Sequence, residues 1–309
     1  MKYLHPLRLY NKTKGFIHDV FWYYMLPDKL YLKIKYKQDH NRYLDLKNPL
    51  SYNEKLDWLK LYDRDPKYHL LADKFRVKGL LAPIIGEEHI IPTIGGPWKK
   101  AEEIDWDSLP QQFVLKCNHD SASVVVCTDK SELDIEKAKK KLNKCVRKDY
   151  YRDENRQWAY KGIDRCIFAE QYLHDEELDD LPDYKFHCFN GKAKCVLVCV
   201  GRFSKSHASM NVYDMDWNKL PYEPGFHNIP WEMPKPKNFD EMRDLAEKIA
   251  SYIGNSYERI DFYSVAGRVY FGEVTFYPGG GSDKLRPIEW EYILGSWIDL
   301  PKQHQERTC

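Results

Sequence analysis

The sequence lacks the features that would assign it to several familiar classes. Its eight cysteines include no Cys-x-x-Cys pair, so their spacing gives no zinc motif. Cysteines that lie inside strand-like apolar runs, where a free thiol behaves as a small hydrophobe, are Cys117, Cys127, Cys188, Cys195 and Cys199. No run approaches the roughly 20 apolar residues that a membrane-spanning helix needs, and the N-terminus has no signal-peptide pattern. We therefore expect a cytoplasmic chain without disulfides.

Neither sign of charge is in excess. Lys and Arg number 48 against 47 Asp and Glu, which leaves a net charge of +1. No overall field draws this chain to nucleic acid, and we expect no nucleic-acid partner. The hydrophobic content of 43% over 309 residues is enough for well-packed cores, and this length favours about two domains.

The most informative stretch runs from Arg259 to Ser282 and reads RIDFYSVAGRVYFGEVTFYPGGGS. Two aromatic-rich runs flank residues 265–267, where Gly267 can adopt a left-handed conformation, so the stretch predicts a β-hairpin. A three-residue loop pairs Asp261 with Phe271. Side chains alternate along strands, and we therefore expect one polar face with Arg259, Asp261, Glu273 and Thr275. The core face is expected to carry Ile260, Phe262, Tyr270, Val274 and Phe276.

Two carboxylates on one face repel each other. Either a cation sits between Asp261 and Glu273, or Arg259 neutralises them, or one of them is protonated. Hard oxygen ligands with open positions suit Mg²⁺ held together with substrate phosphates. A hairpin with solvated acids is the alternative.

A second informative stretch is QFVLKCNHDSASVVVCTD at residues 112–129. It predicts a strand ending in Lys116, a loop of small residues, and a second strand at 124–126. Backbone N–H groups of such a loop can wrap phosphate oxygens, and the lysine supplies a point charge. An ordinary hairpin with an Asx turn at Asn118 or Asp120 is equally compatible. A catalytic dyad of His119 and Asp120 is disfavoured, because neighbouring side chains on an extended chain point to opposite sides.

The remaining chain is read from its periodicity and turn residues. We expect a short aromatic helix within 16–27, a helix after Ser51 with a capping box to Glu54, one helix over 68–81, and a charged outer helix over 131–157. Asn190-Gly191 predicts a hairpin turn, and a helix should end at Gly254. The segment 203–236 carries little secondary-structure signal, which favours a functional loop that recognises the acceptor.

In this order the pieces resemble the ATP-grasp superfamily, and within it the TupA-like family that accompanies bacterial capsular polysaccharide and teichuronopeptide synthesis. The resemblance covers roughly residues 27–300 and rests on NPLSYNEKLDWLKLYD, ADKFRVK, LPQQFVLKCNHDS, IFAEQYL, DYKFHCFNGK and RIDFY with YFGEVTFYPGGG. It implies an α+β ATP-grasp fold: a helical N-terminal arm (1–66), an N-terminal lobe and linker (67–110), a small lobe (111–175), and a large lobe with the metal site (176–309). The nucleotide would lie between the two lobes.

The resemblance also implies site residues. Positions that match ATP contacts are Lys78, Lys116, Asn118, His119, Ser121, Ser123, Glu170, Gln171, Tyr172, Leu173, Asp183 and Lys185. Arg259 and Lys116 match catalytic positions on the phosphates, and Asp261, Glu273 and Thr275 match the Mg²⁺ ligands. Two departures stand out: Thr275 replaces a more usual Asn, and Asp120 and Ala122 replace more usual glycines.

The activity implied is ATP-dependent ligation of a carboxylate and an amine through an acyl phosphate. The resemblance favours a glycan or lipid-linked glycan precursor and an amino acid as substrates, with the amino acid joined to a uronic acid. The alternatives are a capsular glycosyltransferase, for which Asp214-Met215-Asp216 is a weak donor-site motif, an ATP-dependent phosphotransferase, and an inactive nucleotide-binding partner. The basic, aromatic N-terminus makes peripheral membrane contact a further expectation.

Overall fold

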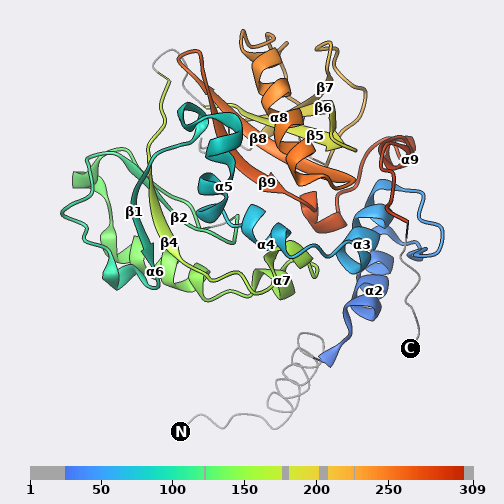
Figure 1. The fold of residues 1–309 in the computed structure, drawn as a ribbon, viewed down its shortest axis with the longest axis horizontal. Coiled ribbons are helices and arrows are strands. Elements are labelled where there is room, and N and C mark those ends of the chain that lie inside the picture. Colours follow the sequence, from blue (N-terminus) through green and yellow to red (C-terminus); the bar gives the residue numbers. More distant parts are fainter. Residues whose placement is uncertain (1–24, 122, 176–180, 202–207, 226, 303–309) are drawn as a thin grey trace, which may run out of the picture.

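Two antiparallel sheets form the framework of the computed structural model, which describes residues 25–121, 123–175, 181–201, 208–225 and 227–302 (Figure 1). The smaller sheet has the order β1-β4-β2-β3 and the larger β7-β6-β5-β8-β9. The strands of the smaller sheet are β1 (Thr93–Trp98), β2 (Phe113–Cys117), β3 (Val125–Cys127) and β4 (Ile167–Gln171). Those of the larger sheet are β5 (Asp183–Phe189), β6 (Lys192–Val200), β7 (Ser209–Asp214), β8 (Tyr257–Val265) and β9 (Arg268–Thr275).

The helices are distributed around these sheets. They are α2 (Asp28–His40), α3 (Tyr52–Tyr62), α4 (Lys67–Leu71), α5 (Arg76–Ile85), α6 (Ile135–Val146), α7 (Tyr150–Asp153), α8 (Phe239–Ile253) and α9 (Glu289–Ser296). Helix α3 packs on α9, and α5 packs on α8. Short 3-10 turns occur at Glu87–His89, Ala101–Glu103, Lys130–Glu132, Trp158–Tyr160 and Pro278–Gly281.

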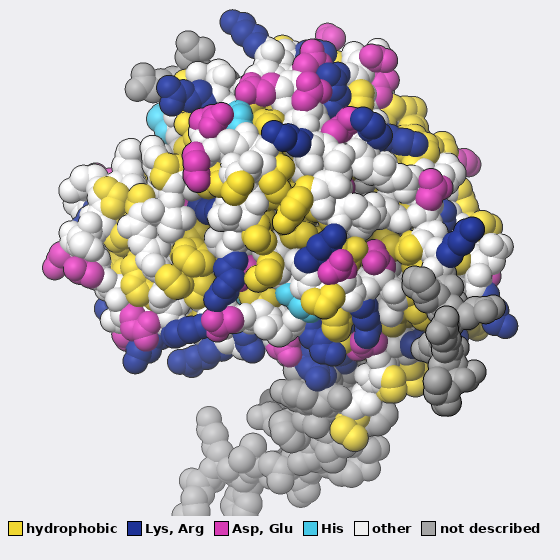
Figure 2. Space-filling view, viewed as in Figure 1, with side chains coloured by type: hydrophobic (Ala, Val, Ile, Leu, Met, Phe, Trp, Pro, Cys, Tyr) yellow, Lys and Arg dark blue, Asp and Glu magenta, His cyan; other side chains and the backbone are white. Residues whose placement is uncertain are grey.

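Each sheet buries one apolar face. Helix α8 packs on β5, β6 and β8, where Phe239 of the helix contacts Phe186 with ring centroids 5.5 Å apart. Helix α6 covers β2 of the smaller sheet through Ala138 and Leu142, and Figure 2 shows Lys and Arg side chains gathered along the edge of the molecule where α6 lies. The opposite faces of the two sheets are thereby left to form the site.

The two predicted hairpins are confirmed, and the register of one is corrected. Asn190 and Gly191 take positive φ values of 51° and 80° in the turn between β5 and β6. The turn between β8 and β9 has two residues, Ala266 and Gly267, because Val265 pairs with Arg268. A bulge near Gly272 then absorbs one residue, so that Asp261 lies opposite Glu273 rather than Phe271.

The bulge also decides which aromatic ring enters the core. Phe271 is 2% exposed and packs against Phe262, whereas Tyr270, expected on the core face, pairs with Tyr263 on the other face. The expectation for Tyr270 was wrong because an unbulged ladder places every second residue on one face, and the extra residue reverses that order beyond it.

Capping residues are confirmed where the sequence predicts them. The Ser51 side chain accepts a hydrogen bond from the Glu54 N–H, and the Glu54 carboxylate accepts one from the Ser51 N–H at 2.9 Å. Helix α8 ends at Gly254, whose φ is 69°. These local bonds satisfy backbone groups that a helix end leaves without partners.

Three helix and loop expectations were wrong. The single helix over 68–81 is two helices, because the Asp73 carboxylate accepts hydrogen bonds from the N–H groups of Phe75 and Arg76, both at 3.0 Å, and starts a new helix. The charged helix over 131–157 is likewise interrupted between α6 and α7. The supposedly structureless 203–236 contains β7, which pairs along β6.

The remaining expectations for whole segments are simple to place. The helix expected within 16–27 lies mostly outside the described residues, as does the proposed membrane contact of the N-terminus. No helix of the described part of the chain is both long and apolar enough to cross a membrane. The seven cysteines of the described residues are buried, and none of them forms a disulfide bond within this part of the chain.

Glu258 on β8 offers a test of this core. It is fully buried on the α8 side of the sheet, and neither carboxylate oxygen has a hydrogen-bond partner among the described residues. Burial raises the pKa of Glu258 well above its usual value. The native state therefore holds this proton more tightly than the unfolded state, and stability falls as pH rises above about 4.3, by up to about 1.4 kcal/mol per pH unit.

We expect Glu258→Gln to flatten this decline, so that its advantage over the parent grows with pH in urea unfolding between pH 4 and 8. Glu232→Gln, at an exposed carboxyl, is the matched control and should leave the pH dependence unchanged. Parallel curves for parent and Glu258→Gln would show that Glu258 does not carry the pH dependence.

Candidate functional site

The β8–β9 hairpin brings four predicted side chains together. Arg259 donates hydrogen bonds to both Asp261 oxygens at 2.6 and 2.8 Å, to Glu273 Oε1 at 2.9 Å and to Thr275 Oγ1 at 3.1 Å. The Thr275 hydroxyl in turn donates to Glu273 Oε1 at 2.9 Å. Of the three outcomes considered for the carboxylates, neutralisation by Arg259 is therefore present in this structure.

Lys185, at the centre of β5, adds a second cation. Its Nζ lies 2.6 Å from Asp261 Oδ2 and 3.2 Å from Asp183 Oδ2. All three side chains are buried, and strand pairing fixes the arrangement, because Lys185 lies opposite Asp261 in the ladder. Buried carboxylates need such partners, since an unpaired buried charge is strongly unfavourable.

Lys74 is a site residue that the sequence analysis did not select. It lies in the turn between α4 and α5, and its Nζ is 3.0 Å from Glu273 Oε2. Burial would raise the pKa of Glu273, but Lys74, Arg259 and Lys185 outweigh it and hold the pKa well below its usual value. Burial would lower the pKa of Lys74, yet Glu273 raises it above the ordinary range. Both side chains are thus charged at neutral pH.

Glu170 on β4 holds the two lysines predicted to contact phosphate. Its carboxylate pairs with Lys78 Nζ at 2.5 Å and with Lys116. Burial alone would raise the pKa of Glu170, but Lys116 and Lys78 lower it below its usual value. Lys78 donates further bonds to the Ile91 carbonyl at 2.8 Å and to Thr93 Oγ1 at 3.1 Å.

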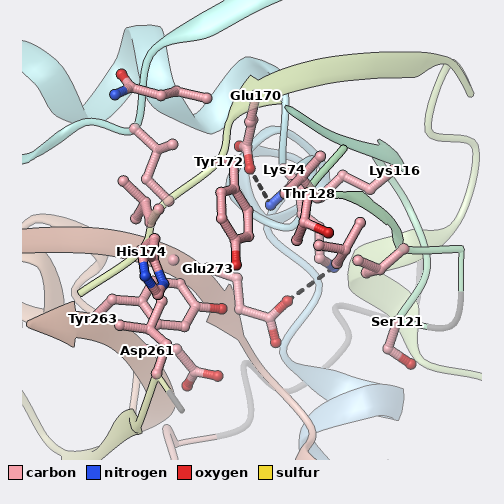
Figure 3. Close-up of a pocket in the computed structure, with 18 of the residues that line it drawn as sticks. Lys74, Lys116, Ser121, Thr128, Glu170, Tyr172, His174, Asp261, Tyr263 and Glu273 are labelled. Atoms are coloured by element: carbon pink, nitrogen blue, oxygen red, sulfur yellow. Dashed lines mark ion pairs between the residues drawn. The ribbon is translucent and has the colours of Figure 1, made fainter. Parts of the chain in front are cut away.

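These groups surround a cavity of about 650 Å³ between the two sheets (Figure 3). Figure 3 shows Glu170 and Lys116 from the smaller sheet facing Glu273 and Asp261 from the larger one, with Lys74 between them. Apolar residues on the wall are Ile91, Val114, Val124, Val126, Leu173 and Leu181. Tyr172 and His174, whose rings stack 6.0 Å apart, are also on the wall. The cavity thus has an apolar part and a charged part.

The predicted residues divide between the wall and the layer behind it. On the wall are Lys116, Ser121, Glu170, Gln171, Tyr172, Leu173, Asp261 and Glu273. Outside the wall are Lys78, Asn118, His119, Ser123, Asp183, Lys185, Arg259 and Thr275. Some of the second group contact residues of the first, as Lys78 contacts Glu170 and Arg259 contacts Asp261.

The loop after β2 is held by its own polar side chains. The Asn118 amide donates to Asp73 Oδ2 at 2.7 Å, and Asn118 Oδ1 accepts from the Cys166 N–H at 2.9 Å. Asp120 Oδ1 accepts from the Ser123 hydroxyl at 2.5 Å, which turns that oxygen toward its own loop. Ser121 lies on the wall, where its hydroxyl is 3.1 Å from Tyr150 Oη. Asp120 Oδ1 also accepts from the Ser123 N–H at 3.3 Å, so Asp120 holds this loop, and the predicted Asx turn itself stays a prediction.

His119 is buried behind this loop. Its Nε2 lies 3.1 Å from the Lys148 carbonyl oxygen. Burial lowers the pKa of His119 to about 4, although the neighbouring Asp120 opposes the change. The imidazole is therefore neutral at neutral pH, and its Nε2 lies against the Lys148 carbonyl.

The carboxylates suit a magnesium ion in kind and number. Asp261 and Glu273 lie opposite each other in the ladder and both face the cavity, and an ion of this type is commonly bound by one or two carboxylates together with phosphates. The described residues contain no group of three or more His, Cys, Asp or Glu that could hold a metal alone. The Thr275 oxygen is already bonded to Arg259 and Glu273. Its role as a ligand stays a prediction.

The weak donor-site motif has a local structural role. Asp214 Oδ1 accepts hydrogen bonds from the N–H groups of Asp216 at 3.0 Å and Asn218 at 2.8 Å. This Asx turn follows β7, outside the residues that line the large cavity. The motif thus gives the glycosyltransferase alternative no support.

The Lys74–Glu273 pair is testable by a double-mutant cycle on stability. We expect Lys74→Met and Glu273→Gln together to cost less than the sum of the two single changes, with a coupling of roughly 1 kcal/mol or more. Glu273→Gln leaves the buried Lys74 without the carboxylate it pairs with, and Lys74→Met removes one of the two cations that pair with Glu273. Urea unfolding at pH 7 measures the cycle.

The exposed pair Lys67 and Asp65, 3.5 Å apart, provides the matched cycle. Its coupling should stay below about 0.5 kcal/mol, because solvent screens exposed ion pairs. Equal coupling in both cycles would contradict the special position of Lys74.

Two structures described as ligases and one described as a synthetase are among the solved structures similar to this chain. D-alanine–D-alanine ligase from Bacillus anthracis in complex with ATP is 17% identical, with a TM-score of 0.38, over 68% of this chain and 55% of that chain. D-alanyl-alanine synthetase A from Vibrio cholerae is 12% identical, with a TM-score of 0.43, over 80% and 63%. ATP-grasp ligase PsnB with its minimal precursor, Mg and ADP is 13% identical, with a TM-score of 0.38, over 72% and 57%. The chain thus spans less than two thirds of their lengths.

Comparison with curated proteins gave no match. A family model described as TupA-like ATP-grasp matches residues 54–299, which is most of the chain. This match confirms the resemblance drawn from the sequence motifs, and with it the α+β ATP-grasp fold with a helical N-terminal stretch. The chain belongs to the TupA-like ATP-grasp family.

Proposed function

We propose that this protein is an ATP-dependent ligase that joins a carboxylate to an amine through an acyl phosphate. The observation that carries the proposal is the cavity between the sheets. Its apolar part suits a nucleotide base, and its charged part holds Lys74, Lys116, Asp261 and Glu273 within one wall. A volume of about 650 Å³ lies within the range of small-molecule and cofactor sites.

The charged part has the groups that phosphoryl transfer needs. Negative charge on the transferring group is spread over its oxygens, so catalysis depends on positioned cations more than on a protein nucleophile. Lys116 and Lys74 reach the cavity directly, and Arg259 orients Asp261 and Glu273 from behind. Mg²⁺ held by these two carboxylates would supply further positive charge to the phosphates.

The lysines are paired with carboxylates before any ligand arrives. Glu170 shares its charge between Lys78 and Lys116, so Lys116 can turn to a phosphate while Lys78 continues to neutralise Glu170. Glu273 keeps Arg259 as a partner if Lys74 turns away. Because Glu170 and Glu273 each pair with two cations, one of the cations can bind a phosphate while the carboxylate keeps the other as its partner.

The proposed substrates are those that the family resemblance favours. We propose a glycan or lipid-linked glycan precursor as the carboxylate donor, with a uronic acid as its reactive residue, and an amino acid as the amine. Such a role belongs to modification of a cell-surface polysaccharide, and it places the chain in the cytoplasm or at the inner membrane face. ATP and Mg²⁺ are the proposed cofactors.

The first test is thermal stabilisation by Mg·ATP. A ligand at about one hundred times its dissociation constant stabilises by about 2.7 kcal/mol, which is visible as a melting shift. We expect this shift to disappear in Lys116→Met and in Glu273→Gln. Lys78→Met is the matched control, because it removes the other partner of Glu170 from outside the wall, and it should retain part of the shift.

The second test is turnover. Candidate uronic acids and amino acids are screened with the parent for ADP release that requires both substrates, since an acyl phosphate is consumed by the amine. ADP release with a hydroxyl acceptor alone would instead identify a phosphotransferase. Stabilisation by a UDP-sugar and not by ATP would contradict the proposed nucleotide.

A further inference from the structure

A second, smaller cavity lies at the end of α2. Its volume is about 320 Å³, and its wall includes Arg42, Lys284, Arg286, Asp39 and Glu291. No residue on this wall lies on the wall of the large cavity. Two segments far apart in sequence therefore meet here: the stretch after α2 and the stretch between the glycine turn at 278–281 and α9.

The three cations of this wall are Arg42, Lys284 and Arg286. Within the described residues, no ion pair joins Arg42, Lys284 or Arg286 to a carboxylate, and Lys284 and Arg286 are exposed. The two acids of the wall are occupied elsewhere. Asp39 pairs with Lys35 at 2.5 Å and accepts from the Ser282 hydroxyl at 2.6 Å.

Glu291 is the second of these acids and is turned to the protein interior. Its Oε1 accepts from the Asn53 amide at 2.5 Å. Burial raises the pKa of Glu291, which Asn53 and Arg42 only partly offset. The wall as a whole thus carries an excess of positive charge.

Arg42 shows that the excess is not only a matter of solvated surface. Its Nη1 donates to Tyr292 Oη at 2.8 Å, and its guanidinium lies over the Tyr292 ring at 5.9 Å. These contacts hold the side chain in place. Its Nη2 is buried and has no hydrogen-bond partner among the described residues. A buried donor without a partner is costly, and an oxyanion in the cavity would accept this hydrogen bond.

Arg286 extends the positive surface beyond this cavity. It also lines a neighbouring cavity of about 490 Å³, whose wall includes Lys219 and Tyr222. The backbone fixes the segment between the two cavities, because Glu223 and Arg286 exchange hydrogen bonds at 2.8 and 3.0 Å. The two cavities together can accommodate a ligand larger than a single anionic group.

We propose that the cavity lined by Arg42, Lys284 and Arg286 is an anion-binding site for a phosphate or carboxylate group. The planar fork of a guanidinium matches both of these groups, and charge-assisted hydrogen bonds to them are strong. We assign this phosphate or carboxylate group to an acidic glycan precursor, and that assignment rests on the proposed ligase function. The binding of an anion in this cavity does not depend on the proposed function.

The site is connected to the end of β9. The Ser282 hydroxyl donates to Asp39, and His40 Nε2 lies 3.2 Å from the Gly281 carbonyl oxygen. Gly281 follows Thr275 by one short turn. An acceptor bound at Arg42 would therefore lie beside residues that contact the turn after β9, the strand that carries Glu273.

The test is titration calorimetry with inorganic pyrophosphate in the presence of excess ADP, which would occupy the large cavity under the proposed function. We expect the double variant Lys284→Gln/Arg286→Gln to bind pyrophosphate about tenfold more weakly or worse, because two charge-assisted contacts are lost. Lys248→Gln, an exposed lysine of α8, should bind as the parent does. Arg42→Lys keeps the charge and loses the fork, and it should also weaken binding.

Lys116→Met separates this site from the nucleotide site. It should lose stabilisation by Mg·ATP and keep pyrophosphate binding, whereas Lys284→Gln/Arg286→Gln should do the reverse. Failure of the ligase proposal would leave pyrophosphate binding intact. If Lys284→Gln/Arg286→Gln binds pyrophosphate with the same affinity as the parent, the proposed anion site is wrong.

The source of the anion is decided by vesicle flotation. Phosphatidylcholine vesicles with and without phosphatidylglycerol are offered to the parent and to Lys284→Gln/Arg286→Gln. Binding of the parent that needs phosphatidylglycerol and is lost in the double variant supports the site with a lipid headgroup as its ligand. Pyrophosphate binding without vesicle binding supports a soluble phosphate. Absence of both kinds of binding in the parent overturns the proposal.

Discussion

Two carboxylates held directly opposite each other in a β-ladder set the main electrostatic constraint of this molecule. Asp261 and Glu273 face one another across β8 and β9, and at that spacing their charges repel. Neighbouring strands and helices answer this repulsion with cations. Arg259 comes from the same strand, Lys185 from β5, and Lys74 from the turn between α4 and α5. The turn between α4 and α5 is therefore held against the larger sheet by the attraction between Lys74 and Glu273.

This dependence explains why the interruption between α4 and α5 matters. In a continuous helix, Lys74 would lie within a regular helical turn. Instead, the Asp73 carboxylate accepts hydrogen bonds from the N–H groups of Phe75 and Arg76, which interrupts the helix. Asp73 is held in turn by Asn118 of the loop after β2. Asn118, in a loop of the smaller sheet, thus holds Asp73, which helps to position the neighbouring Lys74 against Glu273 of the larger sheet. The two sheets are coupled through polar contacts at this point.

Side-chain periodicity predicted much of the site, and long-range pairing supplied the rest. The shared face of Arg259, Asp261 and Glu273 follows from alternation along strands. It survives the register error because the shorter turn and the bulge near Gly272 each shift the pairing by one residue, and a total shift of two leaves these side chains on one face. Alternation could not reveal the bulge, since a glycine inside a strand is compatible with a regular ladder as well. Lys74 was missed for a different reason. Its sequence neighbours fit a helix, and the break depends on the Asp73 carboxylate, which accepts the N–H groups of Phe75 and Arg76 and is held by Asn118.

The turn after β9 links these constraints to the rest of the chain. Gly279, Gly280 and Gly281 all have positive φ, between 57° and 68°, and a Cβ on Gly279 would lie about 2.1 Å from the Asp283 carboxylate. Lys60 of α3 donates to the Gly280 carbonyl at 2.7 Å and to Asp57 at 2.7 Å. Lys60 and Asp57 are both buried.

A buried ion pair stabilises little by itself, because desolvation offsets its attraction, but it specifies one position for the backbone it holds. The left-handed turn is favourable only for glycine, and the pair fixes it against α3. This turn therefore links strand β9, which carries Glu273, to the cavity wall with Lys284 and Arg286. A substrate that spans from the basic wall to the large cavity would meet groups whose relative positions are set by the fold before it binds, which lowers the ordering cost of binding.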